Sequence, residues 1–348
     1  MCPPRCKGTH TQVRPYLVLS GGRRVSHMFS AFIESLRPRQ WTKNFLVFGA
    51  LVFVPGALTV PAMVGRAILA FFLFSFAAGA GYLFNDIRDR EYDLRHPRKG
   101  SRPIPSGRLS VGAALVGAVV LVAIVLAGGL YLDLTDVALP PAATPLDGAA
   151  YPFLSTVAGY FILAVLYSVW LRNVALMDVL VLAAGFTLRA VGGAVALKVT
   201  ISPWLLLCTG LLALYLALGK RRQELVRMGA AEVAGQVGDG SRSRPALSGY
   251  SVSLLDQLLI IAASVNVMSY SLYTFSASGH PDNRLMLTIP FVVYGIFRYH
   301  SLIYNQSAGE APDEVLLNDR PLAICLVLWV ISVTILFFWP GFIPPSGG

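Results

Sequence analysis

The chain has 348 residues, of which 55% are hydrophobic and only 13% are charged, and its formal net charge is +10. Soluble globular domains carry about 25% charged residues, so this composition argues against a soluble globular protein. The apolar content also excludes a disordered chain. Apolar runs of about 20 residues, the length that crosses a bilayer core, recur along the sequence. The sequence therefore predicts a polytopic membrane protein.

The expected organisation is a short tail followed by one membrane domain. Residues 1–27 lack an apolar stretch long enough for a signal-peptide core, so we expect a disordered tail. Residues 28–340 are expected to form a single transferase domain. Its apolar runs are continuous rather than alternating, which favours an all-α bundle over a β-barrel. The bundle is expected to contain nine transmembrane helices at 44–63, 67–87, 110–132, 151–170, 174–197, 203–219, 252–275, 285–303 and 321–339.

Lys and Arg are distributed unevenly between the connections of this bundle. With the N-terminus in the cytoplasm, the cytoplasmic segments hold 24 of these residues and the external segments hold 3. The positive-inside rule then places the C-terminus outside the cell membrane, and it explains the net charge without a nucleic-acid partner. The connections 88–109 and 220–249 are expected to be cytoplasmic active-site loops. A small homo-oligomer packed through lipid-facing helices is compatible with this arrangement.

An acidic cluster closes the second expected span. On a helix its four oxygen-bearing side chains stand at i, i+1, i+4 and i+8 and line one face. They are Asn85, Asp86, Asp89 and Asp93. Carboxylates this close repel one another unless a cation neutralises them, and hard oxygen ligands suit Mg²⁺. The alternative is a solvated helix end paired with Arg88 and Arg90, but unpaired charge at the membrane boundary is costly and favours the metal site.

Basic residues lie beside this cluster in the sequence. Prolines break the helix over 96–108 and hold cations such as Lys99 and Arg102 next to the acidic face. Cations beside a Mg²⁺ site are expected where a polyphosphate lies between them, although positive-inside charge alone would look similar. Lys43, at the start of the first expected span, lies deep enough to reach a central site.

A second basic group ends the sixth expected span. It contains Lys220, Arg221 and Glu224. Lys220 and Glu224 could form a simple i,i+4 surface pair, and the arginines could be topology signals. A functional interpretation requires the bundle to bring this group opposite residues 85–102.

Arg189 is the isolated charge of the apolar run 179–197. An arginine at membrane depth costs about 2.5–3.5 kcal/mol or more unless it faces a polar cavity. Asp178 lies roughly 16 Å away by helical rise, which is too far for a direct ion pair. An anionic ligand or a lipid phosphate is therefore favoured over a structural ion pair, and Arg172 could contribute to the same anionic site.

Together these motifs resemble the UbiA superfamily of intramembrane prenyltransferases, over about residues 30–340. The resemblance rests on nine spans and on Asn85-Asp86-x-x-Asp89-x-x-x-Asp93 after the second span. Most members carry a second Asp-rich motif after the sixth span, whereas this sequence has Gly219-Lys220-Arg221-Arg222-Gln223-Glu224-Leu225. That replacement, with the segments 37–44, 96–104 and 319–320, resembles the branch of decaprenyl-phosphate phosphoribosyltransferases.

The resemblance implies a Mg²⁺-dependent reaction. Enzymes of that branch move 5-phosphoribose from phosphoribosyl diphosphate to a polyprenyl (decaprenyl) phosphate and release diphosphate, a step toward the lipid-linked arabinose donor of arabinogalactan cell walls. It implies that the acidic face holds Mg²⁺ and the diphosphate, with Asp86, Asp89 and Asp93 as its catalytic carboxylates. The residues implied around the phosphoribosyl part are Lys43, Tyr82, Lys99, Arg102, Lys220, Arg221 and Glu224. The residues implied to face phosphate groups are Arg172 and Arg189.

Two other classes of protein remain as alternatives. A UbiA-type prenyltransferase would use a polyprenyl diphosphate and a small aromatic acceptor, but it would be expected to keep both acidic motifs. A transporter of phosphorylated solutes would be expected to show an internal repeat with paired broken helices. The second half of the sequence has no acidic segment that matches 85–93, which counts against the transporter.

Overall fold

The structure is a computed structural model that describes residues 21–54, 56–94, 99–141, 143, 145–146, 152–200, 202–233, 245–276, 284–305 and 319–338. Within these ranges the chain forms helices joined by turns, and no sheet is present. A single isolated β-bridge joins Pro145 to Val199. The predicted all-α class is confirmed for the part of the chain that the structure describes.

Six helical segments are long and apolar enough to cross a membrane. They are α3 (Pro61–Arg88), α5 (Val111–Leu134), α6 (Pro152–Val169), α7 (Met177–Ala196), α9 (Val252–Ser276) and the pair η5 (Arg284–Thr288) with α10 (Ile289–Asn305). Two further helices complete the bundle: α8 (Pro203–Val233) and α12 (Arg320–Phe338). The six segments agree with six of the nine expected spans.

The first expected span, 44–63, is not one continuous helix. It is divided among η1 (Pro38–Phe48), α2 (Gly49–Phe53), η2 (Ala57–Thr59) and the start of α3. Irregular backbone at membrane depth is tolerated where protein surrounds it. Gly193 of α7 provides such a contact, because a Cβ built on it would lie 1.9 Å from the Val47 carbonyl oxygen. The hydropathy of the segment gave no sign of this break.

Two boundaries also differ from those expected. Helix α1 (Gly21–Ser35) includes residues 21–27, which we had placed in the disordered tail, while residues 1–20 lie outside the described part. Helix α8 continues to Val233, so much of the expected loop 220–249 is helical. Residues 220–233 are rich in Lys, Arg, Glu, Met and Ala, which are strong helix formers, and this accounts for the extension. The other expected loop contains the short helix α4 (Arg90–Leu94).

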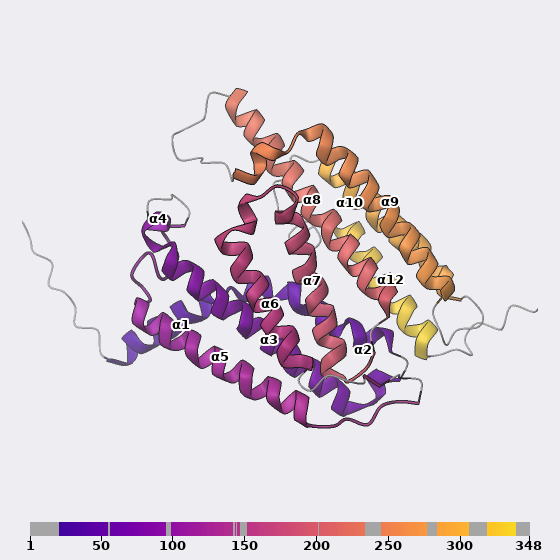
Figure 1. Cartoon of the computed structure of the whole chain (residues 1–348), viewed down its shortest axis with the longest axis horizontal. Helices are drawn as coiled ribbons and strands as arrows, with labels where there is room; N and C mark the ends of the chain where they lie inside the picture. Colours follow the sequence, from indigo (N-terminus) through magenta and orange to yellow (C-terminus); the bar gives the residue numbers. More distant parts are fainter. Residues whose placement is uncertain are drawn as a thin grey trace, which may run out of the picture.

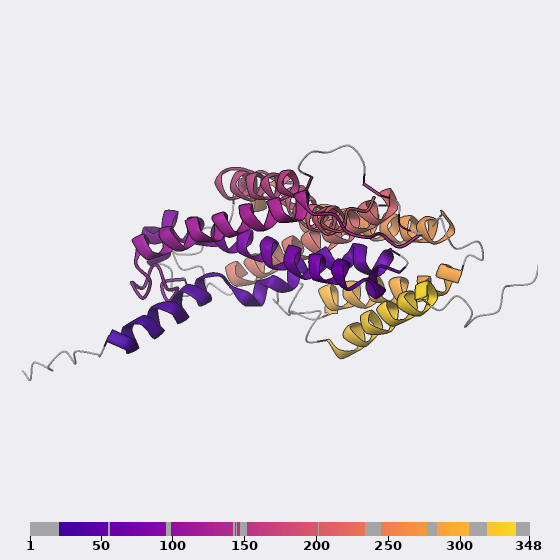
Figure 2. The same cartoon turned by 90° about the horizontal axis from the view of Figure 1, so that it is seen from below.

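The helices form a bundle in which α7 packs between α6 and α8, while α3 packs along α5 (Figure 1). Helices α9, α10 and α12 lie together on the other side of α8. Small residues allow close approach, as is common between membrane helices. A Cβ on Gly192 of α7, for example, would lie 2.3 Å from the Phe74 ring of α3. Helix α1 projects away from the bundle (Figure 2).

Candidate functional site

The C-terminal end of α3 and the helix α4 form a compact cluster of opposite charges. Asp86 and Asp93 are both 2% exposed, and three cations surround them. Arg102 Nη1 lies 3.1 Å from Asp86 and 2.7 Å from Asp93, so one guanidinium joins both carboxylates. Arg37 Nη2 lies 2.6 Å from Asp86, and Lys99 Nζ lies 3.7 Å from Asp93. The predicted neighbourhood of Lys99 and Arg102 with the acidic face is therefore present in the fold.

The other two members of the acidic face point to different partners. The Asp89 side chain is 31% exposed, and it lies 3.0 Å from Arg88 and 3.9 Å from Arg172. Asn85 Nδ2 donates a hydrogen bond of 3.0 Å to Ser168 Oγ at the end of α6. A carboxamide that donates through its nitrogen presents its carbonyl oxygen elsewhere, and that oxygen is a hard ligand of the type Mg²⁺ accepts.

Arg37 is a site residue that the sequence analysis did not single out. It lies 49 residues before Asp86 in the sequence, and it adopts a left-handed backbone with φ 53° and ψ 62°. Its guanidinium carbon also lies 4.8 Å from the centre of the Tyr82 ring, one turn before Asp86 on α3. The available signal was its place in the basic segment 37–44, one of the segments on which the family resemblance rests.

A second charged group lies between the N-terminal end of α7 and the C-terminal half of α8. The Arg221 side chain is 1% exposed and forms an ion pair with the fully buried Asp178. It also lies 2.6 Å from Glu224 and donates to the Tyr167 hydroxyl at 3.3 Å. Glu224 therefore forms an ion pair with Arg221, whereas the sequence had suggested an i,i+4 pair with Lys220. Tyr250 donates to Asp178 at 2.6 Å, and burial together with this hydrogen bond raises the pKa of Tyr250.

The end of α6 joins the two charged groups. Its adjacent residues Tyr167 and Ser168 contact Arg221 and Asn85 respectively. The C-terminal end of α6 therefore lies between Arg221 of α8 and Asn85 of the acidic face. Lys43 of η1 and Lys220 of α8 are both half-buried. Neither Tyr167 nor Ser168 carries a sequence signal, because single polar residues near a helix end are common.

Arg189 lies away from this site, inside the bundle. It is 7% exposed and donates to Asn44 Oδ1 at 2.7 Å, the Gly185 carbonyl at 2.8 Å and the Tyr160 hydroxyl at 2.9 Å. Asp178 pairs with Arg221, in agreement with the expectation that it does not neutralise Arg189. Arg172 lies beside Asp89, whereas Arg189 has the three uncharged partners named above, so a shared anionic site for the two arginines stays a prediction.

The carboxylates of the acidic face do not form a ready-made metal cage. Among the described residues, no three His, Cys, Asp or Glu side chains are grouped as a metal-ligand set. Asp86 and Asp93 are engaged by cations instead, so the four expected ligands do not converge on one point. Mg²⁺ is commonly held by one or two carboxylates together with substrate phosphates and waters. Asn85 and the half-buried Asp89 fit a site of that kind.

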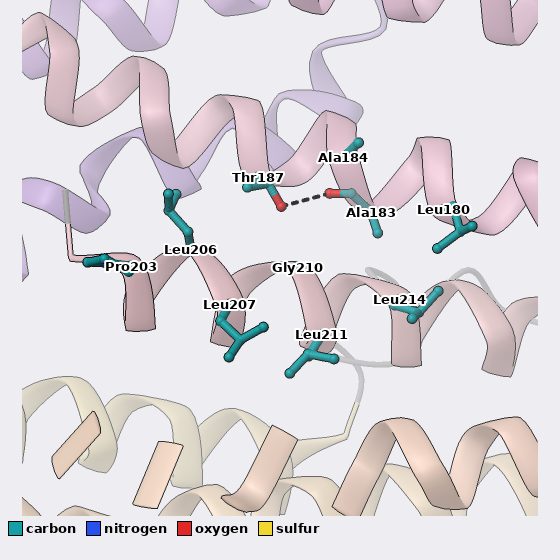
Figure 3. A pocket seen from close by; sticks show the side chains of 10 residues that line it. All are labelled: Leu180, Ala183, Ala184, Thr187, Pro203, Leu206, Leu207, Gly210, Leu211 and Leu214. Atoms are coloured by element: carbon teal, nitrogen blue, oxygen red, sulfur yellow. Dashed lines mark hydrogen bonds between the residues drawn. The ribbon is translucent and has the colours of Figure 1, made fainter. Parts of the chain in front are cut away.

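An apolar groove of about 470 Å³ runs between α7 and α8. Figure 3 shows its aliphatic side chains and the hydrogen bond from Thr187 to the Ala183 carbonyl, which satisfies the polar hydroxyl within its own helix. The lining residues are Leu180, Ala183, Ala184, Thr187, Pro203, Leu206, Leu207, Gly210, Leu211 and Leu214. The two helices that form the groove also carry the ion pair of Asp178 and Arg221.

Comparison with known proteins identifies the family. The UbiA prenyltransferase family matches residues 44–318. Decaprenyl-phosphate phosphoribosyltransferase of Corynebacterium glutamicum is 34% identical over 313 residues, covering 88% of this chain and 86% of that protein. The Mycobacterium tuberculosis protein of the same name is 31% identical over 316 residues, covering 88% and 94%. The solved structure of a UbiA homolog from Archaeoglobus fulgidus bound to GPP and Mg²⁺ shares the fold, with a TM-score of 0.61 at 17% identity over 88% of this chain and 99% of that one. The chain belongs to the UbiA prenyltransferase family.

Proposed function

We propose that this protein moves a 5-phosphoribosyl group from phosphoribosyl diphosphate to a polyprenyl phosphate of the decaprenyl type. The observation that carries the proposal is the arrangement of cations around a single acidic face, with the buried Arg221 group where a second acidic motif would stand. A donor with both a diphosphate and a 5-phosphate needs many positive charges. The names of the relatives from Corynebacterium glutamicum and Mycobacterium tuberculosis support the same assignment.

The donor would lie between the acidic face and the basic group of α8. Arginine offers a planar fork of donors that matches phosphate oxygens, and Arg37, Arg102 and Arg172 are each partly exposed. Asp86 and Asp93 hold Arg37 and Arg102 in place before the donor arrives. The proposed surroundings of the phosphoribosyl part are completed by Lys43, Tyr82, Lys99, Lys220, Arg221 and Glu224.

Asn85 and Asp89 would hold Mg²⁺ together with oxygens of the diphosphate, and Asp86 and Asp93 would support the site through their cations. When bound, the ion neutralises part of the charge of the departing diphosphate. The solved family structure that contains Mg²⁺ supports the use of a divalent cation. The oxygen-rich donor set agrees with the same choice of metal.

The reaction requires little proton transfer from the protein. The bond between the anomeric carbon and the diphosphate breaks, and the diphosphate leaves with the electron pair. An oxygen of the lipid phosphate forms the new bond to the same carbon from the opposite face. A phosphate monoester is already ionised at pH 7, so no strong general base is needed. The protein contributes by aligning the two anions and by stabilising the leaving group with cations that are already in position.

The polyprenyl tail would lie in the apolar groove between α7 and α8. A chain of isoprene units is fully apolar, so it matches the aliphatic lining, and its burial there is favourable by about 25 cal/mol per Å². The lipid phosphate would then sit near the cytoplasmic ends of the same two helices. This position is consistent with the charged group formed by Arg221 and Glu224.

The topology that we propose has nine crossings with a cytoplasmic N-terminus and an external C-terminus. The three crossings beyond the six apolar segments are the interrupted segment 44–63, the first part of α8 and the helix α12. The uneven distribution of Lys and Arg supports this orientation. It places the acidic face on the cytoplasmic side of the cell membrane, where a soluble phosphorylated donor has access.

The proposal is tested with purified protein in detergent. Phosphoribosyl diphosphate, Mg²⁺ and a polyprenyl phosphate are supplied together, and mass spectrometry detects the phosphoribosylated lipid. We expect product with Mg²⁺ and none with EDTA. A parallel reaction offers a polyprenyl diphosphate and an aromatic acceptor. Prenyl transfer in that reaction, with no phosphoribosylated lipid in the first, would overturn the proposal in favour of an aromatic prenyltransferase.

A further inference from the structure

The segment η1 has a conformation that needs support from its surroundings. It contains 11 residues of 3-10 helix, whereas runs beyond three or four residues are uncommon. It begins directly after Arg37, whose positive φ is unfavourable for a residue with a side chain. Strained backbone of this kind persists only where neighbouring structure over-determines it. Arg37 and Lys43, two of the cations proposed to meet the donor, both depend on this segment.

Asn44 joins η1 to two neighbouring helices. It is 2% exposed, its Nδ2 donates to Ser75 Oγ of α3 at 2.9 Å, and its Oδ1 accepts from Arg189 Nε of α7 at 2.7 Å. Ser75 Oγ itself donates to the Phe71 carbonyl at 2.8 Å, so it can only accept from Asn44. The position therefore requires one donor and one acceptor, which a carboxamide supplies.

Arg189 is held in a cradle of uncharged groups. Besides Asn44 it donates to the Gly185 carbonyl and the Tyr160 hydroxyl, and its guanidinium carbon lies 4.7 Å and 5.1 Å from the ring centres of Tyr160 and Phe186. These contacts occupy Nε, Nη1 and Nη2 and cover the guanidinium with aromatic rings. The cradle fixes the guanidinium so that its Nε points at Asn44.

Other contacts extend the same support along η1. The backbone of Val47 lies against Gly193 of α7, where any side chain would collide with it. Trp41 Nε1 donates to the Leu36 carbonyl at 3.2 Å, and its ring packs edge-on against Phe76. With both halves of η1 fixed, the strained residue Arg37 is directed at Asp86.

We propose that Asn44 and Arg189 are positioning residues. Together with Ser75 they lock η1 between α3 and α7 and thereby aim Arg37 and Lys43 at the acidic face. Arg189 acts through Asn44 and not by contact with a phosphate. The inference rests on the proposed function for its consequence in catalysis, because it assigns the aimed cations to the binding of phosphoribosyl diphosphate.

The test compares variants that remove one or both arms of the bridge. Asn44→Ala removes both arms, and we expect the KM for phosphoribosyl diphosphate to rise at least tenfold while the KM for the polyprenyl phosphate changes less than twofold. Ser75→Ala removes only the arm to Ser75, so we expect a rise of about threefold. The matched control is Thr42→Ala, which removes an exposed hydrogen bond within η1 to the Arg39 carbonyl and should leave both KM values unchanged.

Hydrogen–deuterium exchange gives a readout that does not depend on activity. In Asn44→Ala we expect faster exchange in peptides that cover 38–48 and unchanged exchange in peptides that cover 111–134. Unchanged exchange over 38–48, or an equal increase in both regions, would overturn the inference. A donor KM within twofold of wild type in an active enzyme would also overturn it. Failure of the wild type to use phosphoribosyl diphosphate would overturn the proposed function, while the exchange measurement would still decide the bridge.

Discussion

The two ends of α3 contact arginines in two different environments. Near its N-terminal end Arg66 is 7% exposed, and its guanidinium donates to the carbonyls of Leu132, Thr135 and Ala196 and to the Thr135 hydroxyl. These carbonyls lie at the C-terminal ends of α5 and α7, where helices leave backbone acceptors without intrahelical partners. Near its C-terminal end the Arg102 side chain, from the loop that follows α4, is 32% exposed and is shared between Asp86 and Asp93.

This difference in partners and exposure distinguishes an arginine with a structural role, Arg66, from an arginine that can bind a ligand, Arg102. The donors of Arg66 are directed at fixed backbone groups, so a ligand would have to break the ends of two helices to reach it. Arg102 is bound to side-chain carboxylates and is open to solvent, so a phosphate can add to its free side. Substitution of Arg66 should therefore change stability, and substitution of Arg102 should change the kinetics of donor use.

The largest effect is expected for Asp89→Asn. We expect turnover to fall at least 1,000-fold, equivalent to about 4 kcal/mol in the activation free energy, because the variant lacks the carboxylate proposed to hold Mg²⁺. The thermal midpoint should remain near that of wild type, since Asp89 is partly exposed. Asp136→Asn is the control, because this carboxylate lies away from the acidic face, is 96% exposed and pairs with Lys198. Full activity in Asp89→Asn would contradict the assignment.

A smaller kinetic effect is expected for Arg102→Lys. A lysine keeps the charge but is a point charge that cannot hold both Asp86 and Asp93 in the geometry of a guanidinium. We expect kcat/KM for phosphoribosyl diphosphate to fall about 100-fold, or about 2.7 kcal/mol, in steady-state assays. Arg108→Lys in the same loop should leave kcat/KM unchanged. Equal losses of kcat/KM in Arg102→Lys and Arg108→Lys would contradict a specific role for Arg102, because the loop would then respond in the same way to any replacement of arginine by lysine.

The N-terminal end of α3 is probed with Arg66→Gln. We expect the free energy of unfolding to fall by about 3 kcal/mol, because hydrogen bonds to charged groups contribute about 1.5–3 kcal/mol each and several are lost. Thermal denaturation in detergent measures the effect. The KM values of the remaining folded enzyme should match wild type. A raised KM for the donor would contradict the separation between the two ends of α3.

The smallest effect is expected where α1 meets the loop 99–109. Glu34 forms an exposed bidentate pair with Arg108 at 2.7 Å and 2.9 Å, and this hydrogen bonding holds the pKa of Glu34 below its ordinary value. A lowered carboxyl pKa contributes stability above the ordinary value of about 4.3 and loses it as the pH falls through the lowered value. Glu34→Gln should reduce stability by less than about 1 kcal/mol at pH 7, and the difference from wild type should vanish in acid.

The sequence predicted the parts of the site that are local in the chain. Of the expected acidic face, Asp86 and Asp93 do lie together, whereas Asn85 and Asp89 have other partners. The apolar runs predicted six helical segments long and apolar enough to cross a membrane. Contacts between distant segments were not predictable, because no local pattern links Arg37 to Asp86 or Ser168 to Asn85. The break at η1 was also missed, since hydropathy does not distinguish a continuous helix from a 3-10 segment held by its neighbours. Arg189 illustrates the same limit, because its buried charge indicated a polar partner but did not identify Asn44.

Equilibrium binding of phosphoribosyl diphosphate tests the central claim most directly. Isothermal titration calorimetry is performed with Mg²⁺ on wild type, Arg102→Lys and Arg66→Gln, and is repeated on wild type with EDTA. The account predicts that wild type and Arg66→Gln bind the donor with the same affinity, that Arg102→Lys binds at least tenfold more weakly, and that EDTA abolishes the binding. Equal affinity in Arg102→Lys and wild type, or binding that EDTA does not change, would contradict the placement of the donor at the acidic face.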